Sequence, residues 1–114
     1  MVANPFKITH IPNDVHLFRG ILQDHFQNGK ISSAAFKSDE VCVNREDMCT
    51  WQSTQSQKPT YIAVSSVLTR FIREIDALDA LHKPEIDNEA HSIIDGHITR
   101  SLARRIAKEC TVYP

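Results

Sequence analysis

The segment HSIIDGH contains the residue types that most often bind divalent metal ions in proteins. His91 and His97 lie on either side of Asp95, and imidazole nitrogens and carboxylate oxygens are ordinary metal ligands. Their spacing differs from the helical HExxH motif and from paired-cysteine zinc sites. Ordinary structural roles for the two histidines are therefore the favoured interpretation, a metal site is the alternative, and we expect no cofactor.

Arg19 is the second residue with a chemical interpretation. A guanidinium group can bind the phosphates of a nucleotide through two parallel hydrogen bonds. The sequence Leu17-Phe18-Arg19-Gly20 resembles the arginine-bearing strand of small ADP-ribosyltransferase-like domains, and this resemblance implies that Arg19 would hold a nicotinamide dinucleotide. The chain has no matching Ser-Thr-Ser strand or catalytic glutamate in the family's order. An arginine on the surface of a helix is therefore the favoured interpretation.

Other catalytic motifs are missing from the sequence. No serine lies in a G-x-S-x-G motif, and the three glycines form neither of the glycine-rich loops that bind nucleotide phosphates. Cys42 lies between two valines, so a small buried apolar residue is its expected role. We therefore expect a protein without catalytic activity. The alternative is a small enzyme, either a metal-assisted hydrolase or an ADP-ribosyltransferase-like domain that handles NAD.

Length and composition indicate one small domain. The chain has 114 residues, of which 41% are hydrophobic and 24% are charged, which is enough for one core but too little for two. A net charge of −1 excludes a generally basic nucleic-acid-binding protein. We expect no membrane partner and no secretory signal, because no apolar run of the required length is present. The three cysteines form no CxxC pair, which favours reduced thiols and a cytoplasmic location.

Hydrophobic periodicity and turn residues predict the secondary structure. A helix is predicted over 14–28, with Asn28-Gly29 as its end, and another over 99–110, with Thr99 as its cap. The segment 61–82 fits either one helix or, as we favour, a short strand followed by a helix. The other predicted parts are an extended N-terminal arm over 1–12, a strand over 41–43, a polar surface loop over 50–60 and a strand over 91–94.

These elements predict a single α+β domain over residues 1–114. Short strands are expected to form a small sheet, with two or three helices packed on it. The 14–28 and 99–110 helices are expected to lie on the same side of this sheet.

Charge is distributed unevenly along the predicted fold. Residues 74–95 contain seven carboxylates and one lysine, whereas 99–110 contains four basic residues and one glutamate. Neutralisation of the helix by the acidic segment within one molecule is the favoured explanation. The alternative is a polar surface that meets a partner of matching charge. The contacts on such a surface would be Arg19, Arg100, Arg104 and Asp87.

Three segments, DVHLFRGI, ISSAAFKSDEVCVNRE and AHSIIDGHITRSLARRIAKE, resemble a group of short uncharacterised prokaryotic proteins. The resemblance covers about two-thirds of the chain and implies a free-standing bacterial domain, but it assigns no activity, cofactor or catalytic residue to this chain. The missing cofactor motifs and the uneven charge in a chain of this size favour a small cytoplasmic protein-interaction or accessory module that binds another protein or forms a homodimer. DNA binding by the 99–110 helix is a lesser alternative, because the acidic residues before it would repel phosphate.

Overall fold

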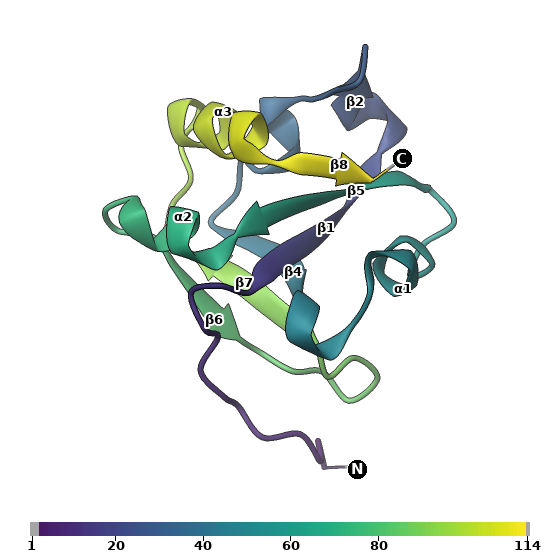
Figure 1. Cartoon of the computed structure of the whole chain (residues 1–114), viewed down its shortest axis with the longest axis vertical. Coiled ribbons are helices and arrows are strands. Elements are labelled where there is room, and N and C mark those ends of the chain that lie inside the picture. The colour runs from purple at the N-terminus through teal and green to yellow at the C-terminus, as the bar shows by residue number, and fades with distance from the viewer. Residues whose placement is uncertain (1–2, 114) are drawn as a thin grey trace.

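The computed structural model describes residues 3–113, which form one large antiparallel sheet, a small second sheet and helices on both faces (Figure 1). Within these residues the large sheet has six strands in the order β6-β7-β4-β1-β5-β8. Its strands are β1 (His16–Leu22), β4 (Glu40–Arg45), β5 (Tyr61–Leu68), β6 (Asp79–His82), β7 (His91–Asp95) and β8 (Thr111–Tyr113). The second sheet pairs β2 (Phe26–Gln27) with β3 (Lys30–Ile31). The helices are α1 (Trp51–Gln55), α2 (Thr69–Glu74), α3 (Arg100–Glu109) and the 3-10 turns η1 (Gln23–His25), η2 (Ser33–Ala35) and η3 (Glu46–Met48). The predicted α+β class is confirmed.

The predicted helix over 14–28 is wrong, because this segment contains strand β1. Leu17 and Ile21 belong to the main core, whereas Phe18 points to the opposite face of the sheet. There the ring of Phe18 meets the ring of Tyr113 edge-on, with 6.1 Å between the centroids. A central strand that is covered on both faces has apolar residues at many spacings, and some of these match the period of a helix.

The Asn28-Gly29 pair also has a different role from the one predicted. It forms the turn between β2 and β3, and the two residues have φ angles of 55° and 73°. Two consecutive positive φ angles are the requirement of the tight hairpin turn in which Asn-Gly is the favoured pair. A pair that suits the end of a helix therefore suits a hairpin equally well, and local sequence does not distinguish the two.

The segment 61–82 contains a strand followed by a helix, as favoured above, and the single-helix alternative is wrong. Strand β5 is longer than predicted, because Ser65 and Ser66 are buried within the sheet instead of capping a helix. Helix α2 begins at Thr69, whose hydroxyl donates a 2.6 Å hydrogen bond to the carbonyl oxygen of Val15. The helix ends at Glu74, so that the last part of the segment forms the unpredicted strand β6.

The polar segment 50–60 is not a loop throughout, because it contains helix α1. The Thr50 hydroxyl accepts a hydrogen bond from the Ser53 N–H, and the Ser53 hydroxyl accepts one from the Thr50 N–H, both at 3.1 Å. This reciprocal capping box begins the helix. The Trp51 ring stacks on Tyr113 of β8 at 5.2 Å between centroids, which anchors α1 to the sheet.

Three other predicted elements are confirmed. The 41–43 and 91–94 strands lie within β4 and β7, and the 99–110 helix is α3. The hydroxyl of Thr99 accepts a hydrogen bond from the N–H of Leu102 at 3.3 Å, so Thr99 caps this helix as predicted. None of the helices within residues 3–113 combines the length and the apolar character that crossing a membrane would require.

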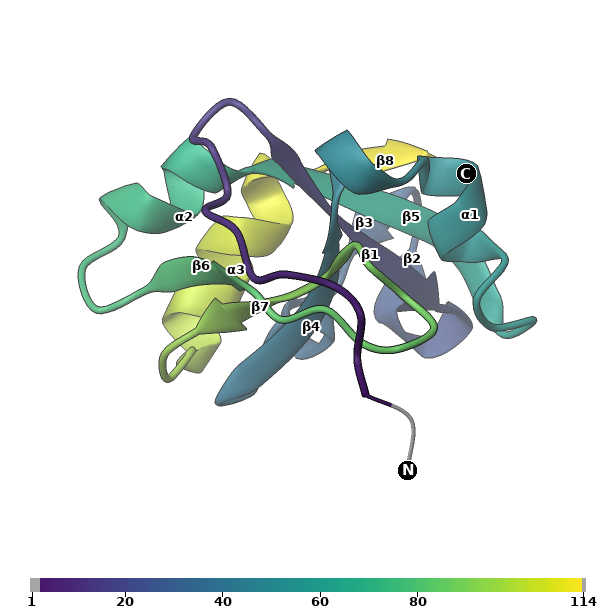
Figure 2. The same cartoon turned by 90° about the horizontal axis from the view of Figure 1, so that it is seen from below.

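The main core lies on one face of the large sheet, beneath α2 and α3, and α1 packs on the other face against β1 and β5. From α3, the side chains of Ala103 and Ile106 are completely buried in this core. Residues 3–12 form no helix or strand and run across the near side of β6 and β7 in Figure 2. This agrees with the predicted arm over 1–12, of which residues 1–2 lie outside the described part of the chain.

Candidate functional site

The structure does not bring the three metal-ligand candidates together. The Nδ1 atom of His91 donates a 2.7 Å hydrogen bond to the carbonyl oxygen of Lys83. The Nδ1 atom of His97 pairs instead with the carboxylate of Asp39, and Asp95 ends strand β7 with its side chain exposed. Among residues 3–113 there is no group of three His, Cys, Asp or Glu side chains that could hold a metal ion.

Arg19 lies on strand β1, so its predicted place on a helix surface is wrong. The β1–β4 ladder contains only two residue pairs, and the last of these joins Phe18 to Asn44. Beyond it the guanidinium group fills the gap between the strands. Its Nε donates to the carbonyl oxygen of Ala35 and its Nη1 to that of Cys42, both at 2.7 Å. Arg19 therefore replaces part of the missing strand pairing, and its burial lowers the pKa of the guanidinium from the ordinary value.

A small hollow of about 50 Å³ lies next to Arg19. Gly20, Cys42, Tyr61 and His91 are among its lining residues. The guanidinium of Arg19 has no carboxylate oxygen within 4 Å among residues 3–113, so its charge has no acidic partner there. Cys42 is exposed, and its predicted burial is wrong, because the two flanking valines take the core face of β4.

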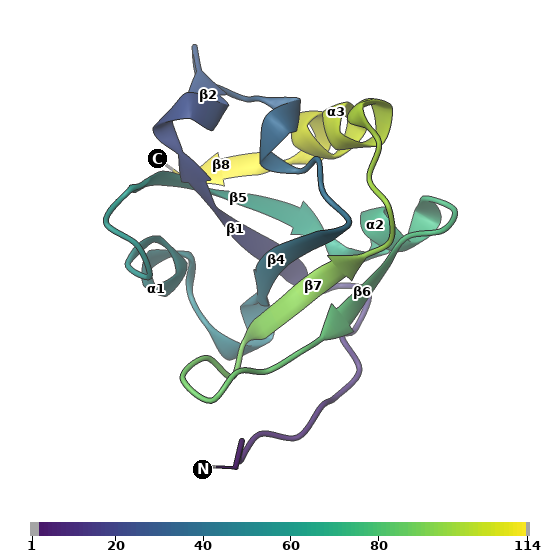
Figure 3. The same ribbon diagram turned by 180° about the vertical axis from the view of Figure 1, so that it is seen from behind.

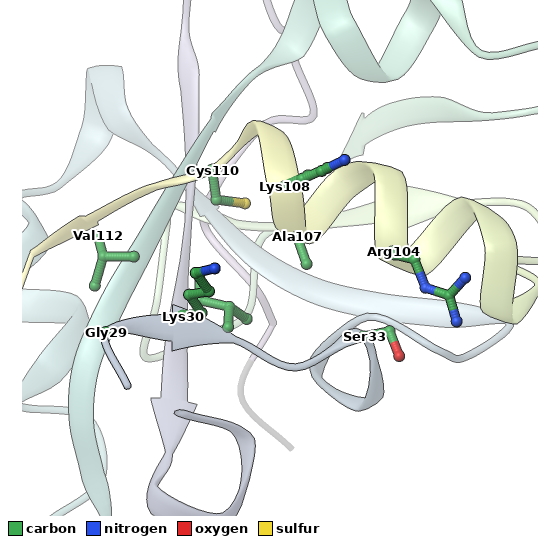
Figure 4. A pocket seen from close by; sticks show the side chains of 9 residues that line it. Gly29, Lys30, Ser33, Arg104, Ala107, Lys108, Cys110 and Val112 are labelled. Carbon is green, nitrogen blue, oxygen red and sulfur yellow. The ribbon is translucent and has the colours of Figure 1, made fainter. Parts of the chain in front are cut away.

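A larger cavity of about 360 Å³ lies between α3 and the segment that follows the β2–β3 turn (Figure 4). We call it the α3 groove. Arg104 and Ala107 reach from α3 toward the segment that contains Lys30 and Ser33. Ile31, Ala107 and Val112 supply an apolar surface. The full lining is Gly29, Lys30, Ile31, Ser33, Arg104, Ala107, Lys108, Cys110 and Val112.

Three cations line the α3 groove, and none of them has a carboxylate oxygen within 4 Å among residues 3–113. Arg104 and Lys108 share one face of α3 because they are four residues apart. The β2–β3 hairpin carries the third cation, Lys30, on the opposite wall of the groove. Of the predicted contacts on α3, Arg104 lines the groove, whereas Arg100 is exposed at the start of the helix and lies outside it.

Lys30 and Val112 were not among the predicted contacts. The Asn-Gly pair before Lys30 is a hairpin signal that could have placed this lysine on a turn. Nothing in the sequence indicates that the turn would lie next to α3.

The wall formed by Cys110 is apolar in character. Its thiol donates a 3.2 Å hydrogen bond to the carbonyl oxygen of Ile106. Burial raises the pKa of Cys110 to about 12, so the side chain is a neutral thiol under physiological conditions. The groove therefore combines apolar walls with a positively charged rim.

The edge strand β8 borders the groove, and Val112 is its contribution to the lining. The opposite edge of the sheet, β6, is protected by side chains. Arg73 Nη2 donates to the carbonyl oxygen of Ala80 at 3.1 Å, and Asp79 Oδ1 accepts from the N–H of Ala80 at 2.7 Å. Charged side chains that occupy an edge in this way discourage the addition of another strand.

Asp87 belongs to a turn between β6 and β7 that we call the acidic loop (residues 85–89). Its three carboxylates, Glu85, Asp87 and Glu89, are all exposed. Figures 1 and 3 show the loop at one end of the molecule and α3 at the other. Within residues 3–113 no ion pair joins segment 74–95 to α3, so the two segments make no direct charge contact, and neutralisation of the helix inside one molecule stays a prediction.

Comparisons of the chain with known protein families, curated proteins and solved structures found no match. The chemistry of the described surfaces is therefore the basis for a functional assignment. The strongest contrast among them is between the cationic α3 groove and the acidic loop at the far end of the molecule.

Proposed function

We propose that the protein is a small protein-interaction module of the bacterial cytoplasm, without catalytic activity, whose α3 groove binds an acidic and partly apolar segment of a partner protein. The observation that supports this proposal is the set of three cations around an apolar-walled cavity of about 360 Å³, none of which has a carboxylate oxygen within 4 Å in the described residues. The three free cysteines are consistent with a reducing compartment.

The charges of Lys30, Arg104 and Lys108 favour a partner with carboxylates. Each exposed ion pair contributes only about 0.2–1 kcal/mol, so the cations mainly select the partner and speed its encounter. The apolar walls supply the larger share of the affinity, at roughly 25 cal/mol for each Å² of apolar surface removed from water. A segment that has both carboxylates and an aliphatic side chain satisfies both parts of the groove.

The edge strand β8 offers a second source of affinity. An extended segment that lies beside a sheet edge can add a strand, so that main-chain hydrogen bonds supplement the side-chain contacts. The β6 edge is closed by Arg73 and Asp79, whereas Val112 of β8 faces the groove. An acidic segment with an aliphatic side chain therefore fits the α3 groove, and one that is extended could also pair with β8.

A direct test is the binding of a fluorescent acidic peptide that contains two isoleucines among its carboxylates. We expect binding to the wild-type protein to weaken at least tenfold between about 50 mM and about 300 mM salt, because the contacts are exposed ion pairs. The R104E/K108E double variant should lose at least tenfold in affinity. Arg105 is an exposed arginine of α3 outside the groove, so the R105E variant is the matched control and should bind like the wild type.

Two results would overturn the proposal. One is equal binding of a peptide in which every carboxylate is replaced by an amide. The other is an equal loss of binding in R105E and R104E/K108E, which would indicate a response to total charge and not to the groove.

A second candidate function is the binding of a nucleotide phosphate by Arg19. It is favoured by one observation, the half-buried guanidinium that lines a hollow without a carboxylate partner. In that case millimolar NAD should raise the melting temperature of the wild-type protein, because a ligand that binds only the folded state stabilises it. An unchanged melting temperature would remove this candidate and leave the interaction module in place.

A further inference from the structure

We infer that the α3 groove of one molecule binds the acidic loop of a second copy of the same chain. The inference rests on the proposed function of the groove and names its partner. It joins the two surfaces of opposite charge that the fold places at opposite ends of the molecule. The sequence shows that the two segments carry opposite charges. Only the fold shows that they lie apart.

The acidic loop is a rigid hairpin turn. The backbone N–H of Glu85 donates to the carbonyl oxygen of Asn88, and the N–H of Asn88 donates back to that of Glu85, both at 3.0 Å. The side chain of Asn88 also donates a 2.9 Å hydrogen bond to Asn44 of β4, which ties the turn to the sheet. A loop that is already ordered loses little conformational entropy when it binds.

The composition of the loop matches the groove. Ile86 is 49% exposed, so an aliphatic side chain stands on the surface between Glu85 and Asp87. It is the kind of group that the apolar walls of the groove can cover. The three carboxylates of the loop can then approach the three cations of the groove. Contacts between two loops or between two grooves would place like charges together, so only the loop-to-groove pairing is favoured.

The same chain cannot make this contact with itself. The molecule is 42 Å long, and Figures 1 and 3 place α3 and the acidic loop toward opposite ends of this long axis. The loop is tied to β4 through Asn88 and Asn44, and α3 is held in the core by Ala103 and Ile106, so neither can move to the other. Contact must therefore occur between copies, in the head-to-tail manner of heterologous interfaces.

The test is self-association, measured by sedimentation velocity of the full chain up to about 1 mM protein, a range that includes weak dimers. We expect the weight-average mass of the wild type to rise above 12.9 kDa with concentration at low salt, and to return to it at high salt. Two charge-reversed variants test the loop and the groove independently. D87K/E89K changes only the loop and R104E/K108E changes only the groove, and each should remain monomeric alone.

Mixing the two variants gives the decisive measurement. Each then meets a surface of opposite charge on the other, so the mixture should associate where the separate variants do not. The matched controls are D76K and R105E, which change exposed charges outside the two surfaces and should associate like the wild type. The labelled acidic peptide should compete with the association.

The outcomes distinguish this inference from the proposed function. A wild-type protein that stays monomeric at every concentration, but binds the acidic peptide in its groove, overturns the inference and leaves the interaction module. A protein that binds neither the peptide nor itself overturns both. Association that persists in R104E/K108E, or that fails to return on mixing, shows that copies meet through another surface.

Discussion

The ring of Tyr61 lies directly over the backbone of Gly20, so that a Cβ atom at position 20 would be only 2.2 Å from Cδ2 of the ring. The two residues belong to neighbouring strands, β5 and β1, near the point where their register shifts. A hydrogen in place of a side chain is what allows the ring to cover the strand. This contact also forms part of the hollow beside Arg19.

Replacement of Gly20 by alanine should therefore destabilise the protein. We expect a loss of about 1–3 kcal/mol in the free energy of unfolding, the ordinary cost of forcing an extra group into a packed site. In a Y61A background the same G20A change should cost much less, since the ring that it displaces is gone. Urea denaturation of the wild type, G20A, Y61A and the G20A/Y61A double variant measures the coupling energy between the two positions. An equal cost of G20A in both backgrounds would show that the ring is not the cause.

Arg45 attaches the N-terminal arm to the sheet. Only 3% of Arg45 is exposed; its guanidinium forms two 2.8 Å hydrogen bonds with Asp47 and further bonds with Thr9 and the carbonyl oxygen of His10. Because R45A leaves these groups without their donor, it should lower the free energy of unfolding by about 2–4 kcal/mol. R45A should also speed cleavage by trypsin after Lys7, and mass spectrometry can measure the rate of this cleavage. R70A removes an exposed arginine and is the control. Equal cleavage of R45A and R70A would contradict the role of Arg45 in holding the N-terminal arm.

Two ion pairs predict how stability responds to acid. The hydrogen bonds from Arg45 to Asp47 and from Arg73 to Asp79 lower the pKa of both carboxyl groups. The stabilisation is therefore fully present above the pKa that each aspartate has in the unfolded chain, and it disappears as pH falls through the lower folded-state pKa. Both carboxylates are partly exposed, so solvent screening keeps each contribution small.

The prediction is a smaller acid effect in the D47N/D79N variant. Urea denaturation between about pH 6 and about pH 2.5 should show a steeper loss of stability in the wild type, with the difference confined to acidic pH. Parallel curves for the two proteins over this range would mean that other groups dominate acid unfolding.

The three cysteines should react with iodoacetamide at very different rates. Cys42 is exposed, whereas burial raises the pKa of Cys49 and raises that of Cys110 to about 12. Only about one Cys110 thiol in ten thousand is then ionised at pH 8, and the thiolate is the reactive form. Mass spectrometry of timed samples should show Cys42 alkylated first and Cys110 last. Concentrated guanidinium chloride should abolish the order; rapid labelling of Cys110 in the folded protein would contradict its burial.

Elements with strong local signals could be predicted from the sequence. Thr99 and the apolar stripe of α3 specify that helix through contacts within a few residues, and the 41–43 and 91–94 strands have β-favouring runs bounded by polar turns. The separation of charge between residues 74–95 and α3 is also a property of the sequence alone. The exposure of Arg104 could also be predicted, because the apolar stripe of α3 shows which positions of the helix face away from the core.

Tertiary structure decided the rest, because the deciding partners are distant in sequence. Residues 16–22 form a strand since β4 and β5 pair with them on both sides, and Asn28-Gly29 is a hairpin turn since the chain on either side of it pairs. Packing likewise brought Lys30 to the wall opposite Arg104, and strand pairing placed the acidic loop, to which Asp87 belongs, toward the other end of the molecule. Residue types and their periods determine local conformation and charge, whereas the position of one charge relative to another depends on strand pairing that spans the whole chain.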